Sequence, residues 1–487
     1  MNGRLVAGVD SSTQSCKVEL RGMTDGELVG SGTAPHPPAS PPASEQDPES
    51  WWQALLEAFS IAMKDAGAAP DDVASISVAA QCHGLVVLDE GDEVVRAAKL
   101  WNDTTSAPEL LELRSRIGDE TLILRTGSLP TAAFTLSKVA WLARHEPHNF
   151  ERVRRILLPH DYLTFLLTGR AVTDRSDASG TGYFDASANR FLTEHLNLIA
   201  DADWLPMLPT VLAPEEVAGE VTKDGLEKLG LRGTVLVGAG GGDQHASALG
   251  LGMRPGDLMY SFGTSGVVMS VTQNPVYDHE GFVNGVADMT NGYDPLVCTL
   301  NAAKVTDFFA LLLGVDHQEL SALALAAPAN QSRPALAAFL DGERTPNRPG
   351  ARGLLSGLTT STTKEQIARA VYEGVVFGLY AGQEHLERAG VDTGGRVIAV
   401  GGGARVSAYT QILADTVQRP VLKADASEAT ARGAAVQAAA IATSAPVTAV
   451  RDAWAPSTET AAEPGTFPSQ AWQDYRATVA VDGLDRS

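Results

Sequence analysis

Cysteine is scarce in this chain of 487 residues, and its three cysteines lie far apart at positions 16, 82 and 298. The odd number and the lack of a CxxC pair argue against a disulfide framework and against a cysteine zinc site. No stretch reaches the ~20 consecutive apolar residues that a membrane helix needs. The opening residues MNGRLVAGVD contain no long apolar segment of the signal-peptide kind. We therefore expect a cytoplasmic protein that does not act at a membrane.

Positive charge is also in short supply, with 37 Lys and Arg against 59 Asp and Glu and a formal net charge of −22. Such an acidic surface repels nucleic-acid backbones and anionic lipids, so we expect no nucleic-acid partner. Hydrophobic residues make up 44% of the chain and charged residues 20%, which is ordinary for a globular protein and excludes a largely disordered one. The length predicts two large domains or three smaller ones.

Strand and turn patterns occur twice along the chain. Residues 5–9 and 16–20 read as a β-hairpin, and residues 73–79 as a buried strand. The pattern restarts near mid-chain, where strands at 258–262 and 267–271 flank a tight turn and a further strand follows at 397–400. This repetition predicts two related α/β domains, which we place at about 1–245 and 246–487.

Helical spacing fills the stretches between these strands. It predicts helices over residues 51–63, 135–145, 161–168 and 364–389, and a buried helix in the Ala-rich run near 433–442. The tail beyond residue 445 is rich in Pro, Ala and Thr, and we expect it to drape over the surface.

Small-residue turns end four of the predicted strands, at residues 10–15, 240–243, 263–266 and 401–403. Phosphate binding needs exposed backbone N–H groups with little side-chain bulk, which Gly, Ser and Thr provide. None of the turns has the GxxxxGK[ST] form of a P-loop, and none forms a GxGxxG turn in an early βαβ unit. A P-loop protein and a dinucleotide enzyme are therefore both disfavoured.

Several segments together resemble the FGGY family of carbohydrate kinases, within the actin-like ATPase superfamily, and most closely its xylulokinase branch. The resemblance runs from about residue 5 to 440 and is carried by GVDSSTQSCK (8–17), QCHG (81–84), LWND (100–103), GGGDQ (240–244), SFGTSG (261–266), FLDGERTP (339–346) and GGGAR (401–405). It implies two actin-like (ribonuclease H-like) α/β domains with a central cleft. It also implies ATP-dependent phosphorylation of D-xylulose with Mg²⁺, the sugar site lying mainly in the first domain and the nucleotide site in the second.

The resemblance assigns the acidic residues of the reaction. Asp243 matches the general base that takes the proton of the sugar hydroxyl, although by itself an Asp at this place is as readily a helix cap. Asp10 matches the aspartate that acts through Mg²⁺, although alone it could be an Asx-turn residue. Lys17 either assists or is structural.

The same resemblance assigns the nucleotide and sugar contacts. Thr13, Gly263 and Thr264 would contact the phosphates, and Gly402 and Gly403 would line the adenosine pocket. The sugar would meet Cys82, His83, Trp101, Asn102, Asp103 and Gln244. A lone His after a strand is usually structural, and only its place in QCHG favours a sugar contact. Three positions depart from the pattern: Cys82 stands where Met or Gln is usual, Gln244 where many xylulokinases have Asn, and Ala133 where glycine is common.

Three alternatives stay open on the sequence alone. The chain could phosphorylate another substrate of the same family, such as ribulose, a pentitol or glycerol. It could be an actin-like ATPase that moves or binds a protein, but that class lacks the paired QCHG and LWND segments. It could be an inactive sugar sensor, which the intact Asp10 and Asp243 disfavour. The resemblance also predicts a homodimer.

Overall fold

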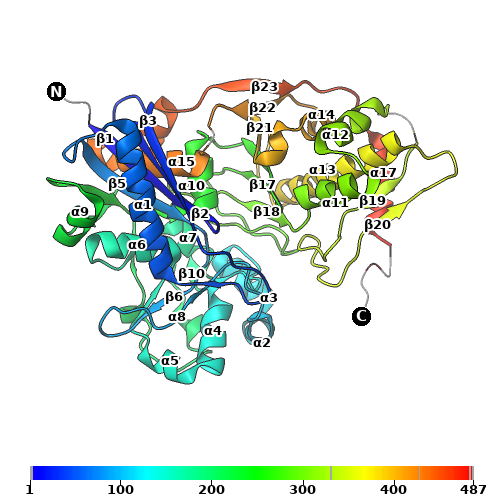
Figure 1. The fold of residues 1–487 in the computed structure, drawn as a ribbon. Coiled ribbons are helices and arrows are strands. Elements are labelled where there is room, and N and C mark those ends of the chain that lie inside the picture. Colours follow the sequence, from blue (N-terminus) through cyan, green and yellow to red (C-terminus); the bar gives the residue numbers. More distant parts are fainter. Residues whose placement is uncertain (1–3, 329–331, 427, 482–483, 485–487) are drawn as a thin grey trace.

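Two β-sheets organise the computed structural model, which describes residues 4–328, 332–426, 428–481 and 484 (Figure 1). The strands of the first sheet are β1 (Leu5–Ser11), β2 (Ser15–Gly22), β3 (Leu28–Pro35), β5 (Val73–Ala80), β13 (Val217–Glu220), β14 (Leu236–Gly238) and β15 (Gly241–Gly242). Those of the second are β16 (Leu258–Phe262), β17 (Gly266–Ser270), β18 (Leu296–Thr299), β21 (Val397–Val400), β22 (Val421–Ala424) and β23 (Thr458–Ala462). The first sheet has the order β13-β14-β5-β1-β2-β3, with β15 beside β5, and the second has the order β18-β17-β16-β21-β22-β23.

The two sheets repeat one arrangement, as the sequence predicted. In the first, β1 pairs antiparallel with β2 and parallel with β5. In the second, β16 pairs antiparallel with β17 and parallel with β21. Because ligands of such sheets bind beyond the carboxyl ends of the strands, the turns after β1, β5, β16 and β21 are the places to look for a site.

Helices cover both sheets. They are α1 (Pro48–Ala66), α6 (Pro159–Thr168), α9 (Lys223–Leu229), α10 (Asp243–Gly250), α11 (Ala303–Leu313), α12 (His317–Ala326), α13 (Lys364–Arg388), α14 (Ser407–Val417), α15 (Ala429–Thr443), α16 (Val447–Ala453) and α17 (Ser469–Val479). Those predicted at 51–63, 161–168, 364–389 and 433–442 correspond to α1, α6, α13 and α15. The first begins at Pro48, slightly before the predicted range of 51–63, because the Asp47 side chain accepts a hydrogen bond from the Glu49 N–H at 3.1 Å and Pro48 occupies the first turn.

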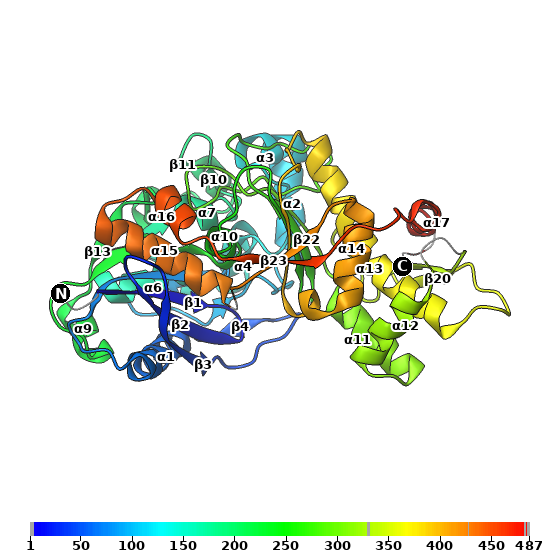
Figure 2. The same ribbon diagram turned by 90° about the horizontal axis from the view of Figure 1, so that it is seen from above.

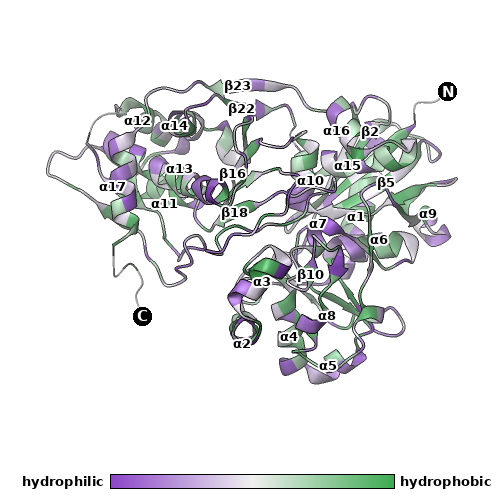
Figure 3. Cartoon of the chain, turned by 180° about the vertical axis from the view of Figure 1, so that it is seen from behind, coloured by the Kyte–Doolittle hydropathy of each residue, from purple (hydrophilic) through white to green (hydrophobic). Residues whose placement is uncertain are grey.

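A lobe of short elements hangs below the first sheet. It contains α2 (Ala107–Ile117), α3 (Asp119–Thr126), α4 (Thr135–His145), α5 (Pro147–Arg152), α7 (Arg175–Ala178), α8 (Thr193–Leu196) and short strands such as β6 (Val86–Leu88), β7 (Ala98–Lys99), β8 (Arg155–Leu157) and β9 (Val172–Asp174). Its own hydrophobic cluster includes Leu136, Val139 and Trp204. Surface helices in this lobe and elsewhere carry both hydrophilic and hydrophobic residues, as helices with one buried face do (Figure 3).

One helix from the second half of the chain packs on the first sheet. Figure 2 shows α15, in orange, beside β1 and β2, in blue. The approach is close: a Cβ at Gly8 of β1 would lie 1.9 Å from the Ala431 carbonyl oxygen, so glycine is required there. Gln437, buried inside this helix, accepts hydrogen bonds from the Ser77 hydroxyl at 2.5 Å and the Gly240 N–H at 2.9 Å. The Ala-rich run is thus a buried helix, as predicted, and it belongs spatially to the first sheet.

The tail beyond residue 445 does not drape loosely, so that expectation is wrong. Strand β23 pairs antiparallel with β22 at the edge of the second sheet. In α17, Trp472 and Tyr475 are buried, and their rings lie 5.4 and 5.5 Å from that of Phe377 on α13. The Pro, Ala and Thr content hid two aromatic residues at i, i+3 spacing, which form one buried face of a helix.

Within the described residues, no single helix is long and apolar enough to span a membrane; taken together, α11 and α12 pass on length and composition but are bent by 90°.

Candidate active site

A cavity of about 500 Å³ lies between the two sheets. Its walls come from β1, β2 and α10 on one side and from β16, β21, β22 and the start of α15 on the other. They include Asp10, Lys17, Gln244, Ser247, Gly402 and Arg405. Three of the residues predicted for the site (Asp10, Gln244 and Gly402) thus share one cavity although they are far apart in the sequence.

Asp10 lies near the carboxyl end of β1 and is 5% exposed. Its Oδ1 accepts a hydrogen bond from the Ser12 hydroxyl at 2.5 Å. Burial raises the pKa of Asp10 to about 7, and the nearby Asp243 charge adds to the rise, while the bond from Ser12 opposes it.

Asp243 is the first residue of α10, directly after the Gly run that follows β14. Its Oδ1 accepts hydrogen bonds from the Gln244 N–H at 2.8 Å and from the Cys82 thiol at 3.4 Å. Burial raises the pKa of Asp243, and the Cys82 hydrogen bond is the largest effect that lowers it. Asp243 carries no side-chain cap of the helix, whose N-cap residue is Gly242. Cys82 therefore meets the carboxylate directly, a contact that the sequence did not reveal.

His83 follows Cys82 in a strained turn with a φ of 65°. Its backbone N–H donates to Asp177 at 3.1 Å, and its ring stacks on Phe134 with centroids 5.1 Å apart. Gly180 passes so close that a Cβ there would lie 2.0 Å from the imidazole. Burial, followed by the charge of Lys138, holds the pKa of His83 well below its usual range, so the ring is neutral and can both donate and accept.

The LWND segment (100–103) contacts the turn between β1 and β2. The Trp101 indole N–H donates to the Thr13 hydroxyl at 3.0 Å, and that hydroxyl donates to Gln81 Oε1 at 3.2 Å. Asn102 Oδ1 is buried without a hydrogen-bond partner among the residues that the structure describes. A buried amide oxygen of this kind fits a ligand that supplies the missing donor.

Asp103 is placed differently from its neighbours. Its carboxylate is fully buried and accepts hydrogen bonds from Lys99 Nζ at 3.1 Å, from the Thr105 N–H at 2.9 Å and from the Thr105 hydroxyl at 2.5 Å. This position favours a role in holding the LWND loop over direct contact with a sugar.

The residues of the two glycine turns in the second half also differ in position: one lines the cavity and the others do not. Gly402 faces open space, since a Cβ there would meet no atom within 4 Å, and it lines the cavity. Gly403 is buried, and a Cβ there would lie 2.6 Å from the Cβ of Phe262, so it serves packing. Gly263 and Thr264 form the β16–β17 turn, outside the cavity wall. Their carbonyl oxygens accept hydrogen bonds from the N–H groups of Ala303 and Ala302, at 2.9 and 3.2 Å, where α11 begins.

Magnesium fits this site through Asp10. Within the described residues no group of three or more His, Cys, Asp or Glu side chains could hold a metal ion by itself. Mg²⁺ in phosphoryl-transfer sites commonly takes one or two carboxylates and completes its shell with phosphate oxygens and water. A single buried carboxylate in the wall of the cavity suits that pattern.

Sequence reasoning missed a buried ion pair beneath Asp243. His245 Nδ1 lies 2.9 Å from both carboxylate oxygens of Asp294. Burial lowers the pKa of His245, but the Asp294 charge outweighs this effect and raises it to about 9. The charged ring helps to keep Asp243 ionised. The two partners are 49 residues apart, and neither lies in a segment with a distinctive pattern.

The cavity also contains charged residues for which the sequence gave no firm role. Lys17 forms an ion pair of 2.6 Å with Glu428, and Arg405 and Lys423 add positive charge to the wall. These cations offset the acidic groups around a site that would receive a polyphosphate.

Comparison with known proteins places the chain among sugar kinases. Residues 5–250 match the N-terminal domain of the FGGY family of carbohydrate kinases, and residues 258–442 match its C-terminal domain. A xylulose kinase of Streptomyces rubiginosus is 43% identical over 463 residues, covering 95% of this chain and 92% of that protein. A xylulose kinase of Streptomyces coelicolor is 43% identical over 453 residues, covering 93% of this chain and 91% of that protein.

Solved structures give the same answer for the fold. The crystal structure of a xylulose kinase from Bifidobacterium adolescentis is 36% identical, with a TM-score of 0.86, and the match covers 98% of this chain and all of that one. The predicted fold of two actin-like α/β domains around a central cleft is confirmed.

Proposed function

The chain belongs to the FGGY family of carbohydrate kinases, and from that premise we propose that it transfers the γ-phosphoryl group of ATP to D-xylulose, giving D-xylulose 5-phosphate. One observation carries the choice of substrate: relatives named xylulose kinase are 43% identical over more than nine-tenths of this chain. Other sugars or polyols, and an ATPase without a sugar substrate, are not favoured.

Asp243 acts as the general base. Phosphoryl transfer needs a positioned nucleophile and stabilisation of charge, with little covalent work by the protein. The carboxylate accepts the proton of the sugar hydroxyl as that oxygen attacks the γ-phosphorus, and ADP leaves. A pKa raised by burial makes Asp243 a better proton acceptor than an exposed Asp.

ATP occupies the cavity between the sheets. Gly402 leaves room for the nucleotide, and the turns after β1 and β16, with Thr13, Gly263 and Thr264, approach the phosphates. The Thr13 hydroxyl already hydrogen-bonds Trp101 and Gln81, so the backbone N–H of Thr13 is the group that would donate to a phosphate oxygen. Asp10 would hold Mg²⁺, which neutralises phosphate charge when bound. Gly403 shapes the pocket by letting Phe262 approach.

The sugar lies in the first domain, against the loop that follows β5. The neutral His83 ring hydrogen-bonds a hydroxyl, the Trp101 ring supplies an apolar platform, and the Asn102 amide fills its missing bond. Gln244 lies beside Asp243 on α10 and reaches the same substrate. Cys82 acts mainly through Asp243, and Asp103 supports the loop from behind.

The cellular setting follows the same reasoning. We propose a cytosolic enzyme, supported by three free cysteines, of which Cys16 and Cys82 are buried. Sugar and ATP are its partners in this proposal, and the homodimer expected from the resemblance stays a prediction.

A coupled ADP-release assay tests the function. The protein is supplied with ATP, Mg²⁺ and separately D-xylulose, D-ribulose, xylitol and glycerol, beside Asp243→Ala. We expect D-xylulose to give the highest kcat/KM. A clear preference for another substrate, or equal ADP release without any sugar, would refute the proposal.

A further inference from the structure

The segment 339–346 (FLDGERTP) supplies no residue to the proposed mechanism, yet hydrogen bonds hold it firmly in place. Glu343 within it is 3% exposed. Its Oε1 accepts hydrogen bonds from the Leu300 N–H at 2.5 Å and the Arg344 N–H at 2.7 Å, and its Oε2 accepts one from the Asn301 amide at 2.8 Å. These bonds tie the segment to the end of β18 and fix the backbone from which the Arg344 side chain leaves.

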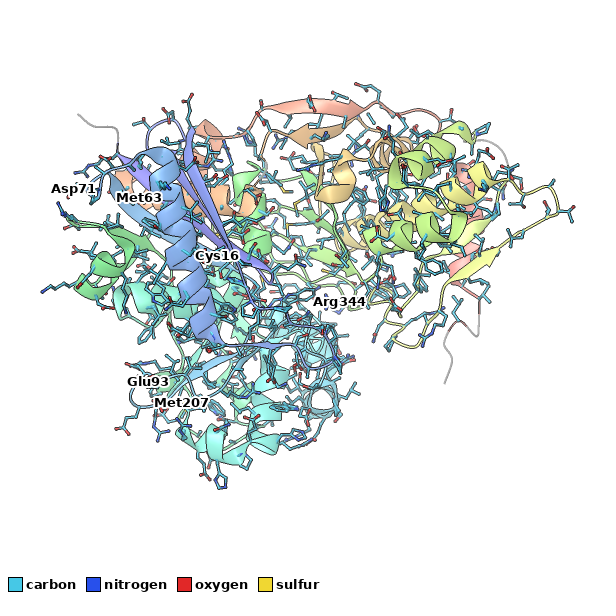
Figure 4. The ribbon with its side chains drawn as sticks, viewed as in Figure 1. Cys16, Met63, Asp71, Glu93, Met207 and Arg344 are labelled. Atoms are coloured by element: carbon cyan, nitrogen blue, oxygen red, sulfur yellow. The ribbon has the colours of Figure 1, made fainter. Side chains whose placement is uncertain are left out.

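Arg344 lies at the boundary between the two halves. Figure 4 places it where the second half approaches the lobe that carries α2 and α3. The side chain is half-buried, and no carboxylate among the described residues forms an ion pair with it. Its side chain hydrogen-bonds the Cys298 thiol, a weak acceptor. A half-buried guanidinium with five donors and so weak a partner is suited to receive acceptors from a ligand.

The Arg344 charge influences two residues of the first half, His83 and Lys138, at the proposed sugar site. Burial is the main cause that lowers the pKa of His83, and the Arg344 charge contributes to it across the boundary. Burial also lowers the pKa of Lys138 to about 7, again with a contribution from Arg344. Arg344 therefore comes from the second half, but its charge acts on the loop in the first half where His83 stacks on Phe134.

Lys138 is not available for this task. Its Nζ is buried and donates to the carbonyl oxygens of Ala132, Ala133 and Phe134, which shape the loop behind His83. Of these two cations, Arg344 is the one whose guanidinium, apart from its contact with Cys298, donates to no acceptor among the described residues.

We propose that Arg344 hydrogen-bonds the bound sugar, and that the second half of the molecule thereby takes part in sugar recognition. The hydroxyl and keto oxygens of a ketose are acceptors, and a planar guanidinium can address two neighbouring ones at once. Because this donor belongs to the half that also binds ATP, sugar binding draws the two halves together. The identity of the sugar rests on the function proposed above; the contact itself does not.

The test compares Arg344→Met and Arg344→Lys with the wild type. Arg352→Met is the matched control, because Arg352 lies on the same connection and is exposed, and its guanidinium donates, among the described residues, to the nearby carbonyls of Gly350 and Ala351. We expect Arg344→Met to raise the KM for D-xylulose roughly 10- to 100-fold while the KM for ATP stays within about twofold. Arg344→Lys keeps the charge but loses the planar pair of N–H donors, so its KM for D-xylulose should lie between those of the wild type and Arg344→Met. Arg352→Met should match the wild type.

Several outcomes would overturn the proposal. An unchanged sugar KM in Arg344→Met would do so. A fall in kcat alone would assign the guanidinium to the phosphoryl group. A rise in both KM values with a lower Tm would give Arg344 a structural role. If the wild type prefers another sugar, the proposed function fails, and the Arg344 contact is then judged by the KM of that sugar.

Discussion

The two β-hairpins that face each other across the cleft have the same framework and different chemistry. At the end of the first, Asp10 of β1 lies opposite Lys17 of β2 and beside Ala79 of β5. At the equivalent register of the second, Ser261 of β16 lies opposite Val267 and beside Val400. Both side chains line the same cavity, but only the first hairpin carries an acid there.

The loops that follow the neighbouring parallel strands, β5 and β21, also differ in their side chains. Strand β5 is followed by Gln81, Cys82 and His83, all with polar groups, whereas β21 is followed by three glycines. The repeated fold brings backbone turns to both sides of the cavity. Side chains then make one side a sugar and acid site, and bare backbone makes the other a nucleotide site.

Removing the base gives the largest expected effect. Asp243→Ala should lower kcat by roughly 10²- to 10⁴-fold, because alanine leaves no carboxylate at this position to accept the proton. Sugar binding, measured by calorimetry, should persist. Asp243→Asn is the control of equal size, and it should lose as much turnover as Asp243→Ala. Turnover retained in either variant would remove Asp243 from the base role.

Exchanging the acid tests the asymmetry of the two hairpins directly. Asp10→Asn should lower kcat by on the order of 10²-fold, through loss of the charge that would hold Mg²⁺. The matched change in the second hairpin, Ser261→Ala, should leave kcat within about threefold. Initial rates over a range of Mg²⁺ concentrations measure both. An equal loss of kcat in the two variants would show that the two hairpins contribute equally to catalysis.

Much of this framework could be predicted from the sequence. The strand at 258–262 and the helix at 135–145 have the predicted ends, because alternating or 3.6-residue hydrophobic patterns determine them locally. The packing of α15 on the first sheet could not be foreseen, since it depends on which glycines allow helix and strand to touch. The Cys82–Asp243 and His245–Asp294 contacts join residues 161 and 49 positions apart, a separation over which local patterns carry no information.

The division between sugar and nucleotide loops predicts opposite effects on the two KM values. His83→Ala should raise the KM for the sugar roughly tenfold, through loss of one neutral hydrogen bond, and should leave that for ATP nearly unchanged. Gly402→Val should do the reverse, because its side chain would project into the open space of the cavity. Steady-state kinetics with each substrate varied in turn distinguish the two. A rise in both constants for either variant would contradict the division.

The smallest expected effect concerns the thiol that contacts the base. Cys82 donates a hydrogen bond to Asp243 and so favours its charged form, which lowers a pKa that burial has raised. Cys82→Ala removes the donor, so the pKa of Asp243 should rise further. Since only the ionised carboxylate accepts the proton, activity falls as pH decreases through that pKa. The acid limb of kcat/KM should therefore move to higher pH by up to about one unit in Cys82→Ala. Cys82→Ser supplies a stronger donor and should move the limb the other way, and limbs that coincide in all three proteins would show that the thiol has no influence on the base.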